Sequence, residues 1–67
     1  MTNFHQSFKE LRIEKGLSQQ VVAESLGVNQ RTVSSWEVSR VEPDFSMLVK
    51  IAKFFEVTTD YLLGNEN

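Results

Sequence analysis

The chain of 67 residues contains no cysteine, one proline and three glycines. Without cysteine, neither a disulfide framework nor a thiolate-ligated zinc site can stabilise the fold. No apolar run approaches the roughly 18 residues of a membrane-spanning helix. The first residues lack the basic and apolar segments of a secretion signal. These absences predict one small cytoplasmic domain over residues 1–67 that holds no cofactor and no metal and does not bind a membrane.

An excess of basic residues is also missing. Seven Lys and Arg residues stand against nine Asp and Glu residues, which gives a formal net charge of −2. Domains that bind nucleic acid usually carry a basic excess. The overall charge therefore gives no support to such a function, and its distribution along the chain has to be considered separately.

Apolar residues recur at helical spacing through most of the chain. No segment keeps the alternation of period two that predicts a strand. Residues typical of helix N-caps precede several of the apolar stripes. The pattern predicts an all-α fold, a compact five-helix bundle with helices at about 4–15, 18–26, 29–38, 44–55 and 58–63.

The expected core follows from the same spacing. Val33 and Trp36 lie on one face of the third predicted helix, so we expect both in the core rather than in a binding site. The fourth predicted helix carries one apolar stripe at the spacing i, i+3, i+6, i+7 and i+10: Phe45, Leu48, Ile51, Ala52 and Phe55.

Residues 19–36 carry the most specific pattern. Ala23 is small where two short helices would cross, and Gly27 can adopt the left-handed conformation that a turn between them needs. Val28 and Val33 then close the pair against the rest of the domain. The joint occurrence of these residue types at these spacings predicts a helix-turn-helix.

The chain resembles the phage-repressor helix-turn-helix family, of the Cro/cI or Xre-like type. The resemblance covers about residues 4–64 and rests on the segments 11–12, 15–19, 23–28, 32–37 and 60–64. It implies a lambda-repressor-like DNA-binding domain whose second and third helices dock on double-stranded DNA. It also implies a transcriptional regulator, a repressor in this interpretation, that binds a near-palindromic operator as a homodimer, which can form on the DNA.

The site residues follow from this docking. Opposite Val33 and Trp36, the third helix presents polar side chains that suit base edges. The resemblance implies that residues at these positions make the base contacts: Gln30, Arg31, Ser34 and Ser35. Phosphate contacts are expected from Gln19, Asn29, Thr32 and Arg40. The resemblance further implies that Arg12 and Glu37 form a buried ion pair between the first and third helices.

Some positions depart from the family pattern. Glu42 and Asp44 are acidic where relatives often contact phosphate, and Glu56 replaces a common glycine, so the fourth helix is expected to end differently. Val21 is apolar on an outward face.

A patch of Val57, Thr58 and Tyr61 is the candidate dimer surface. Two lysines against five acidic residues give residues 41–67 a net charge of −3, so the acidity lies mostly outside the expected DNA-binding surface.

Two other functions are alternatives to DNA regulation. The acidic balance favours a protein-interaction module, such as an antitoxin, built on the same fold. An enzyme is disfavoured, because the sequence contains no nucleophile–base arrangement, no cluster of metal ligands and no phosphate-binding glycine loop. Binding to DNA that weakens steeply with salt would separate the regulator from the interaction module.

Overall fold

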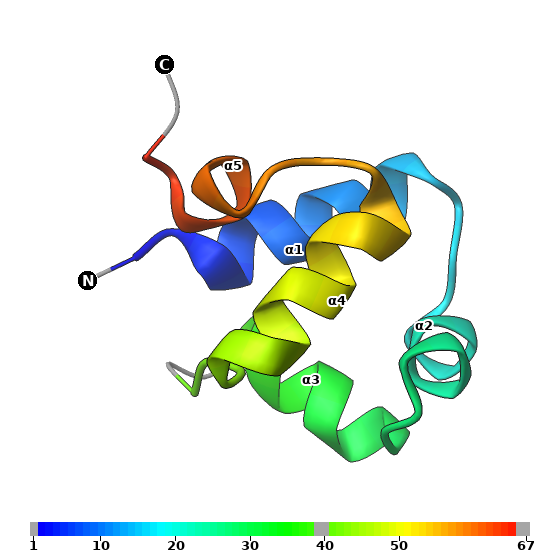
Figure 1. Ribbon diagram of the computed structural model, residues 1–67. Helices are drawn as coiled ribbons and strands as arrows, with labels where there is room; N and C mark the ends of the chain where they lie inside the picture. Colours follow the sequence, from blue (N-terminus) through cyan, green and yellow to red (C-terminus); the bar gives the residue numbers. More distant parts are fainter. Residues whose placement is uncertain (1, 39–40, 66–67) are drawn as a thin grey trace.

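The computed structural model describes residues 2–38 and 41–65, and this part of the chain is all helical (Figure 1). Its elements are α1 (Phe4–Glu14), α2 (Gln19–Leu26), α3 (Gln30–Val38), α4 (Phe45–Phe55) and α5 (Thr59–Leu63). The predicted five-helix bundle is confirmed. Four of the helices begin one residue later than predicted, because the residue counted as their first is the N-cap.

Side-chain caps define where four helices begin. In each, a side-chain oxygen accepts a hydrogen bond from the backbone N–H three residues later, which satisfies a donor that the helix itself leaves unpaired. Such a cap stabilises a helix by about 1 kcal/mol. The pairs are Ser18 with Val21 at 3.1 Å, Asn29 with Thr32 at 2.9 Å, Asp44 with Met47 at 2.9 Å and Thr58 with Tyr61 at 3.0 Å.

An aromatic cluster forms the centre of the core. The ring of Phe8 meets Trp36 edge-on at 5.5 Å and Phe55 edge-on at 5.7 Å. Phe4 stacks on Phe8 at 5.4 Å. Edge-on ring pairs add about 0.5–1.5 kcal/mol beyond the area they bury. Because these rings come from α1, α3 and α4, the cluster fixes the inner face of α3 and leaves its other face outward.

The helices divide into two groups in space (Figure 1). α2 and α3 lie together at one end, α1 and α5 lie together at the other, and α4 runs between the groups. Asn3 donates its backbone N–H to the carbonyl of Leu63 across 3.2 Å, which ties the start of α1 to the end of α5. α1 also contacts α3 through the rings of Phe8 and Trp36, so the helix-turn-helix pair is packed against the other helices.

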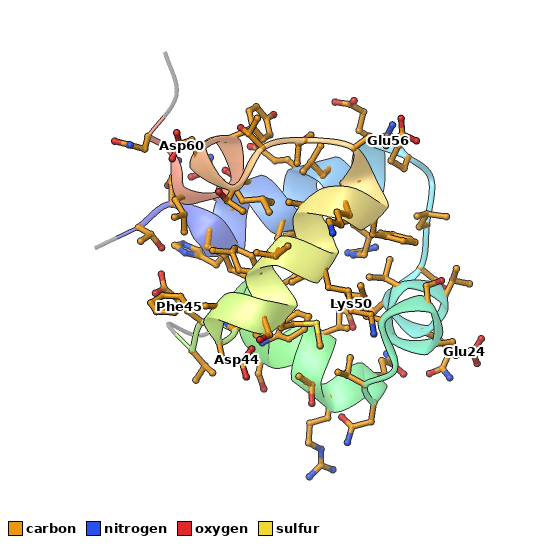
Figure 2. The ribbon with its side chains drawn as sticks, viewed as in Figure 1. Glu24, Asp44, Phe45, Lys50, Glu56 and Asp60 are labelled. Atoms are coloured by element: carbon orange, nitrogen blue, oxygen red, sulfur yellow. The ribbon has the colours of Figure 1, made fainter. Side chains whose placement is uncertain are left out.

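α4 differs in two ways from what its sequence pattern suggests. Phe45 is 88% exposed, although Ile51, Ala52 and Phe55 in the same stripe are buried. Figure 2 shows Phe45 in the first turn of α4, pointing away from the bundle. The end of the helix also follows the usual form, because Glu56 adopts the left-handed conformation at φ 59° and ψ 43°. The apolar stripe of α4 thus extends beyond the core at Phe45. At the other end of the helix, Glu56 occupies the left-handed position that glycine commonly holds.

Candidate nucleic-acid interface

The turn between α2 and α3 is built from backbone bonds around one glycine. Gly27 ends α2 in the left-handed conformation at φ 77°. This geometry lets the N–H of Val28 bond to the carbonyl of Ala23 across 3.0 Å. A residue with a Cβ is disfavoured in this conformation. Ala23, which the sequence places where the two helices cross, is buried at 1% exposed.

α3 presents a polar face to solvent. Val33 and Trp36 are buried, 0% and 4% exposed, on its inner side. The predicted base-contact residues lie on its other side, and we call them the reading face: Gln30 and Arg31 are exposed, and Ser34 and Ser35 are half-buried. Gln can donate and accept at an adenine edge, Arg can make two bonds to guanine, and Ser can bond to several bases. The structure thus brings these four side chains together on one helix.

A chain of hydrogen bonds links the reading face to the interior. Nε2 of Gln30 donates to Oε1 of Gln19 at 3.3 Å, and Nε2 of Gln19 donates to Oε1 of Glu37 at 3.1 Å. Gln19 is in the first turn of α2, so the bonds join both helices of the pair. The sequence placed Gln19 and Gln30 in separate roles, and it contained no signal that their side chains bond to each other.

The predicted ion pair is present at the end of this chain. Nε and Nη2 of Arg12 donate to the two carboxylate oxygens of Glu37 at 2.6 and 3.0 Å, and Nη1 donates to the carbonyl of Leu17 at 2.8 Å. The side chain of Glu37 is only 1% exposed. The hydrogen bond to Glu37 raises the pKa of Arg12 above its ordinary value, although burial acts to lower this pKa. Glu37 is therefore structural, although it belongs to α3.

The predicted phosphate contacts have unequal support in the structure. Oδ1 of Asn29 accepts bonds from the backbone N–H and the hydroxyl of Thr32 at 2.9 and 3.0 Å. Both residues therefore stabilise the start of α3, and Thr32 is half-buried. Gln19 lies at the start of α2, where free backbone N–H groups and the helix dipole favour an anion. Arg40 lies outside the residues that the structure describes.

The two acidic residues before α4 have structural partners. Asp44 is the N-cap of α4, and a carboxylate oxygen of Glu42 accepts a hydrogen bond from the hydroxyl of Thr2. Their place in the sequence raised doubt about phosphate contacts from this loop. Asp44 therefore begins α4, and Glu42 links this loop to the N-terminal segment.

Lys50 makes a contact with α2 that the sequence did not predict. Its Nζ donates to the backbone carbonyl of Leu26, the last residue of α2, across 2.8 Å. The two residues are 24 positions apart, and helical spacing within α4 gives no information about α2. The sequence thus showed Lys50 only as one charge among others in α4.

Other kinds of site receive no support from the described residues. Within residues 2–38 and 41–65, no three His, Cys, Asp or Glu side chains gather as they would to hold a metal ion. Over the same ranges, no helix has the length and apolar character needed to cross a bilayer.

Comparison with known proteins gives consistent relatives. The Helix-turn-helix family model matches residues 8–62. The chain is 40% identical over 63 residues to the HTH-type transcriptional activator BcrR of Enterococcus faecalis, covering 94% of this chain and 31% of that protein. A crystal structure of a transcriptional regulator from Listeria innocua has a TM-score of 0.90 at 30% identity, covering 100% of this chain and 63% of that one.

A second solved structure supports the fold at lower identity. The P22 c2 repressor, crystallised with a synthetic operator, has a TM-score of 0.87 at 24% identity, covering 98% of this chain and 100% of that one. The chain spans about half the length of the curated relatives it matches, or less, with 31% and 55% for two of them. What those longer proteins do as a whole is therefore not carried over by the match.

Proposed function

The chain belongs to the helix-turn-helix family, and from that premise we propose that it is a transcriptional regulator that binds double-stranded DNA sequence-specifically. The observation that carries the proposal is the reading face of α3, which is polar and solvent-facing on a helix whose other side is anchored by Trp36. In this docking geometry the second helix of the pair enters the major groove. The regulator acts in the cytoplasm, where bacterial and phage DNA is found.

Base recognition is assigned to Gln30, Arg31, Ser34 and Ser35. A well-aligned bidentate contact from Gln to adenine or from Arg to guanine discriminates against a wrong base by about 1–3 kcal/mol. The bond from Gln30 to Gln19, at 3.3 Å on the surface, favours one orientation of the reading amide before DNA is bound. Such preorganisation reduces the entropy lost on binding.

Phosphate contacts are assigned to Gln19, Asn29, Thr32 and Arg40. Asn29 uses its oxygen for the cap of α3, so its Nδ2 group is the part that can donate to phosphate. Gln19 uses one hydrogen of Nε2 for Glu37 and keeps a second for the DNA backbone. With few cations in this set, non-specific binding should be weak, and specificity should depend mainly on base contacts.

The protein is further proposed to bind a near-palindromic operator as a homodimer that can form on the DNA. Two copies related by a two-fold axis would place their α3 helices in successive major grooves, about 34 Å apart. Val57, Thr58 and Tyr61 are the proposed contact between the copies. Tyr61 is 42% exposed, which supports the assignment, because an exposed aromatic side chain is a common anchor in interfaces.

Repression is the proposed effect on transcription. Relatives include both an activator and a repressor by name. A reporter gene placed behind a DNA sequence that the protein binds shows whether transcription is repressed or activated. Lower expression in the presence of the protein supports repression, and higher expression contradicts it.

The direct test selects bound sequences from a random DNA pool and measures affinity for them by fluorescence anisotropy. Gln30→Ala and Arg31→Ala should each weaken binding by about tenfold or more and relax the preferred base at one position. Gln6→Ala and Lys9→Ala are matched controls, because these exposed residues of α1 lie on a different helix. Unchanged affinity and specificity in both reading-face variants contradict the proposal.

A protein-interaction module or antitoxin is the second candidate, and the net charge of −2 favours it. The same assay separates the two functions. Phosphate contacts make the logarithm of the affinity fall linearly with the logarithm of the salt concentration. A flat profile on every DNA, together with failure of the selection, supports the interaction module instead.

A further inference from the structure

The C-terminal end of α2 depends on another helix for one of its hydrogen bonds. The last carbonyls of any helix lack partners within that helix. Here the N–H of Val28 and that of Gly27 bond to the carbonyls of Ala23 and Glu24. The carbonyl of Leu26 is not reached by these turn bonds. It accepts instead from Nζ of Lys50, in the middle of α4, at 2.8 Å.

The ammonium group of Lys50 lies directly beside the turn. A Cβ placed on Gly27 would lie 3.7 Å from Nζ, so the group lies near the residue on which the turn is built. α2 has no basic residue in its own last turn, although a cation at that end is favoured by the helix dipole. Figure 2 shows Lys50 on the side of α4 that faces α2. Lys50 therefore supplies from α4 the charge and the donor that α2 lacks.

The bond from Lys50 to Leu26 connects α4 to the turn between α2 and α3. The turn at Gly27 sets the direction in which α3 leaves α2, and α3 carries the reading face. A lysine close to a DNA-binding unit is ordinarily assigned to a phosphate, as a point charge in solvent. In this structure its ammonium group is bonded to a backbone carbonyl of the protein, which gives it a defined position before DNA is present.

We propose that Lys50 is a positioning residue for DNA recognition, which holds the α2–α3 turn through the carbonyl of Leu26 rather than by contacting the DNA. The inference rests on the proposed function, since it concerns the placement of the same reading face. It assigns a role in sequence recognition to a residue of α4 that lies outside the helix-turn-helix segment.

Three variants of the full chain separate positioning from a phosphate contact. Lys50→Met removes the donor and keeps an unbranched apolar stem. Lys50→Arg retains a cation and a donor, and should restore the contact. Lys53→Met is the control, because Lys53 is an exposed lysine of the same helix and its loss changes the net charge equally. Thermal melts establish that each variant is folded at the assay temperature.

Binding to the selected operator and to unrelated DNA is measured across a salt series. Lys50→Met should weaken operator binding by about tenfold relative to Lys53→Met. Its affinity for unrelated DNA and its salt slope should match those of the control, and Lys50→Arg should recover most of the loss. A salt slope reduced by about 1 relative to the control identifies a phosphate contact and overturns the inference. Unchanged operator affinity also overturns it.

Amide hydrogen exchange without DNA provides an independent measurement. The N–H groups of Gly27 and Val28 should exchange faster in Lys50→Met than in Lys53→Met or the unmodified chain, because the turn loses its bond to α4. Equal exchange contradicts the positioning role. If the unmodified chain binds no DNA at all, the proposed function and the role of Lys50 in recognition both fail, and the exchange result still decides whether Lys50 holds the turn.

Discussion

The side-chain amide of Gln19 donates to Oε1 of Glu37 across 3.1 Å, and the same carboxylate accepts two bonds from Arg12. Gln19 also accepts a bond from Gln30, on the reading face. A buried ion pair that stabilises the bundle is therefore also the support for two residues proposed to contact DNA. Stability and recognition share one network in this domain, so a change in the buried pair should affect both.

Removing the charge of Glu37 tests the structural half of the network. Glu37→Gln leaves the guanidinium of Arg12 without its carboxylate, and losing one partner of a buried pair typically costs about 3–5 kcal/mol. Urea denaturation followed by circular dichroism measures the free energy of unfolding. The double variant Arg12→Met with Glu37→Met should lose less than Glu37→Gln, because neither charge is left alone. A loss below about 1 kcal/mol in Glu37→Gln contradicts the assignment.

The raised pKa of Arg12 predicts the pH range over which the guanidinium contributes. A group whose pKa is higher in the folded state stabilises the fold fully below its unfolded value, and this contribution is lost as the pH rises through the folded value. For Arg12 the loss begins only at strongly alkaline pH, above the ordinary pKa of an arginine side chain. The difference in unfolding free energy between the unmodified chain and Arg12→Met should thus stay constant from neutrality to about pH 10. A difference that shrinks steadily over this range contradicts the prediction.

Phe45 and Phe55 test how far the core extends along α4. Their side chains are 88% and 2% exposed. Phe55→Ala should cost about 3–5 kcal/mol, because it leaves a cavity beside the ring of Phe8. Phe45→Ala should change the free energy of unfolding by no more than about 0.5 kcal/mol. Similar losses for the two variants, measured by urea denaturation, would show that Phe45 is packed in solution.

The contrast between these two residues shows what the sequence could and could not predict. Local signals were sufficient for the helices, since caps such as Ser18 and Asp44 act on backbone groups three residues away. Helical spacing shows which residues share a face, but it does not show where along the helix the core ends. For that reason the spacing places Phe45 in one stripe with Ile51 and Phe55, although Phe45 is exposed.

The candidate site also has a part that the sequence predicts and a part that it does not. The residues of the reading face could be predicted because they share one helix, and Arg12–Glu37 could be predicted from the family resemblance. The bonds from Gln30 to Gln19 and from Lys50 to Leu26 join residues 11 and 24 positions apart on different helices. Such contacts depend on how the helices pack, and no local pattern in the sequence encodes them.

Tyr61 tests the proposed contact between two copies on the operator. Tyr61→Ala should weaken binding to a site with both halves by about tenfold, since an aromatic anchor at an interface commonly contributes this much. Binding to a single half-site should not change. Phe45→Ala is the matched control, another exposed aromatic residue outside the proposed patch. Fluorescence anisotropy measures the affinity for the full operator and for the half-site. Equal weakening on the two DNAs excludes Val57, Thr58 and Tyr61 as the dimer contact.

Glu56 offers a stabilising change away from the reading face. It holds the left-handed conformation at φ 59°, which costs a residue with a Cβ about 1 kcal/mol or slightly more, and glycine avoids this cost. The conformation is needed there, because it allows the N–H of Val57 to bond to the carbonyl of Ala52 across 2.9 Å. Its carboxylate also lies at the negative end of the α4 dipole, which is unfavourable.

Glu56→Gly should therefore stabilise the fold by about 1 kcal/mol, which for a domain of this size raises Tm by roughly 4–8 °C. Glu56→Lys keeps the Cβ and reverses the charge, so it measures the dipole contribution alone, expected at about 0.3–1 kcal/mol. Figure 2 shows Glu56 at the end of α4 far from α3, so operator affinity should not change in either variant. If Glu56→Gly leaves Tm unchanged or lowers it, the left-handed conformation is not a source of strain in this chain.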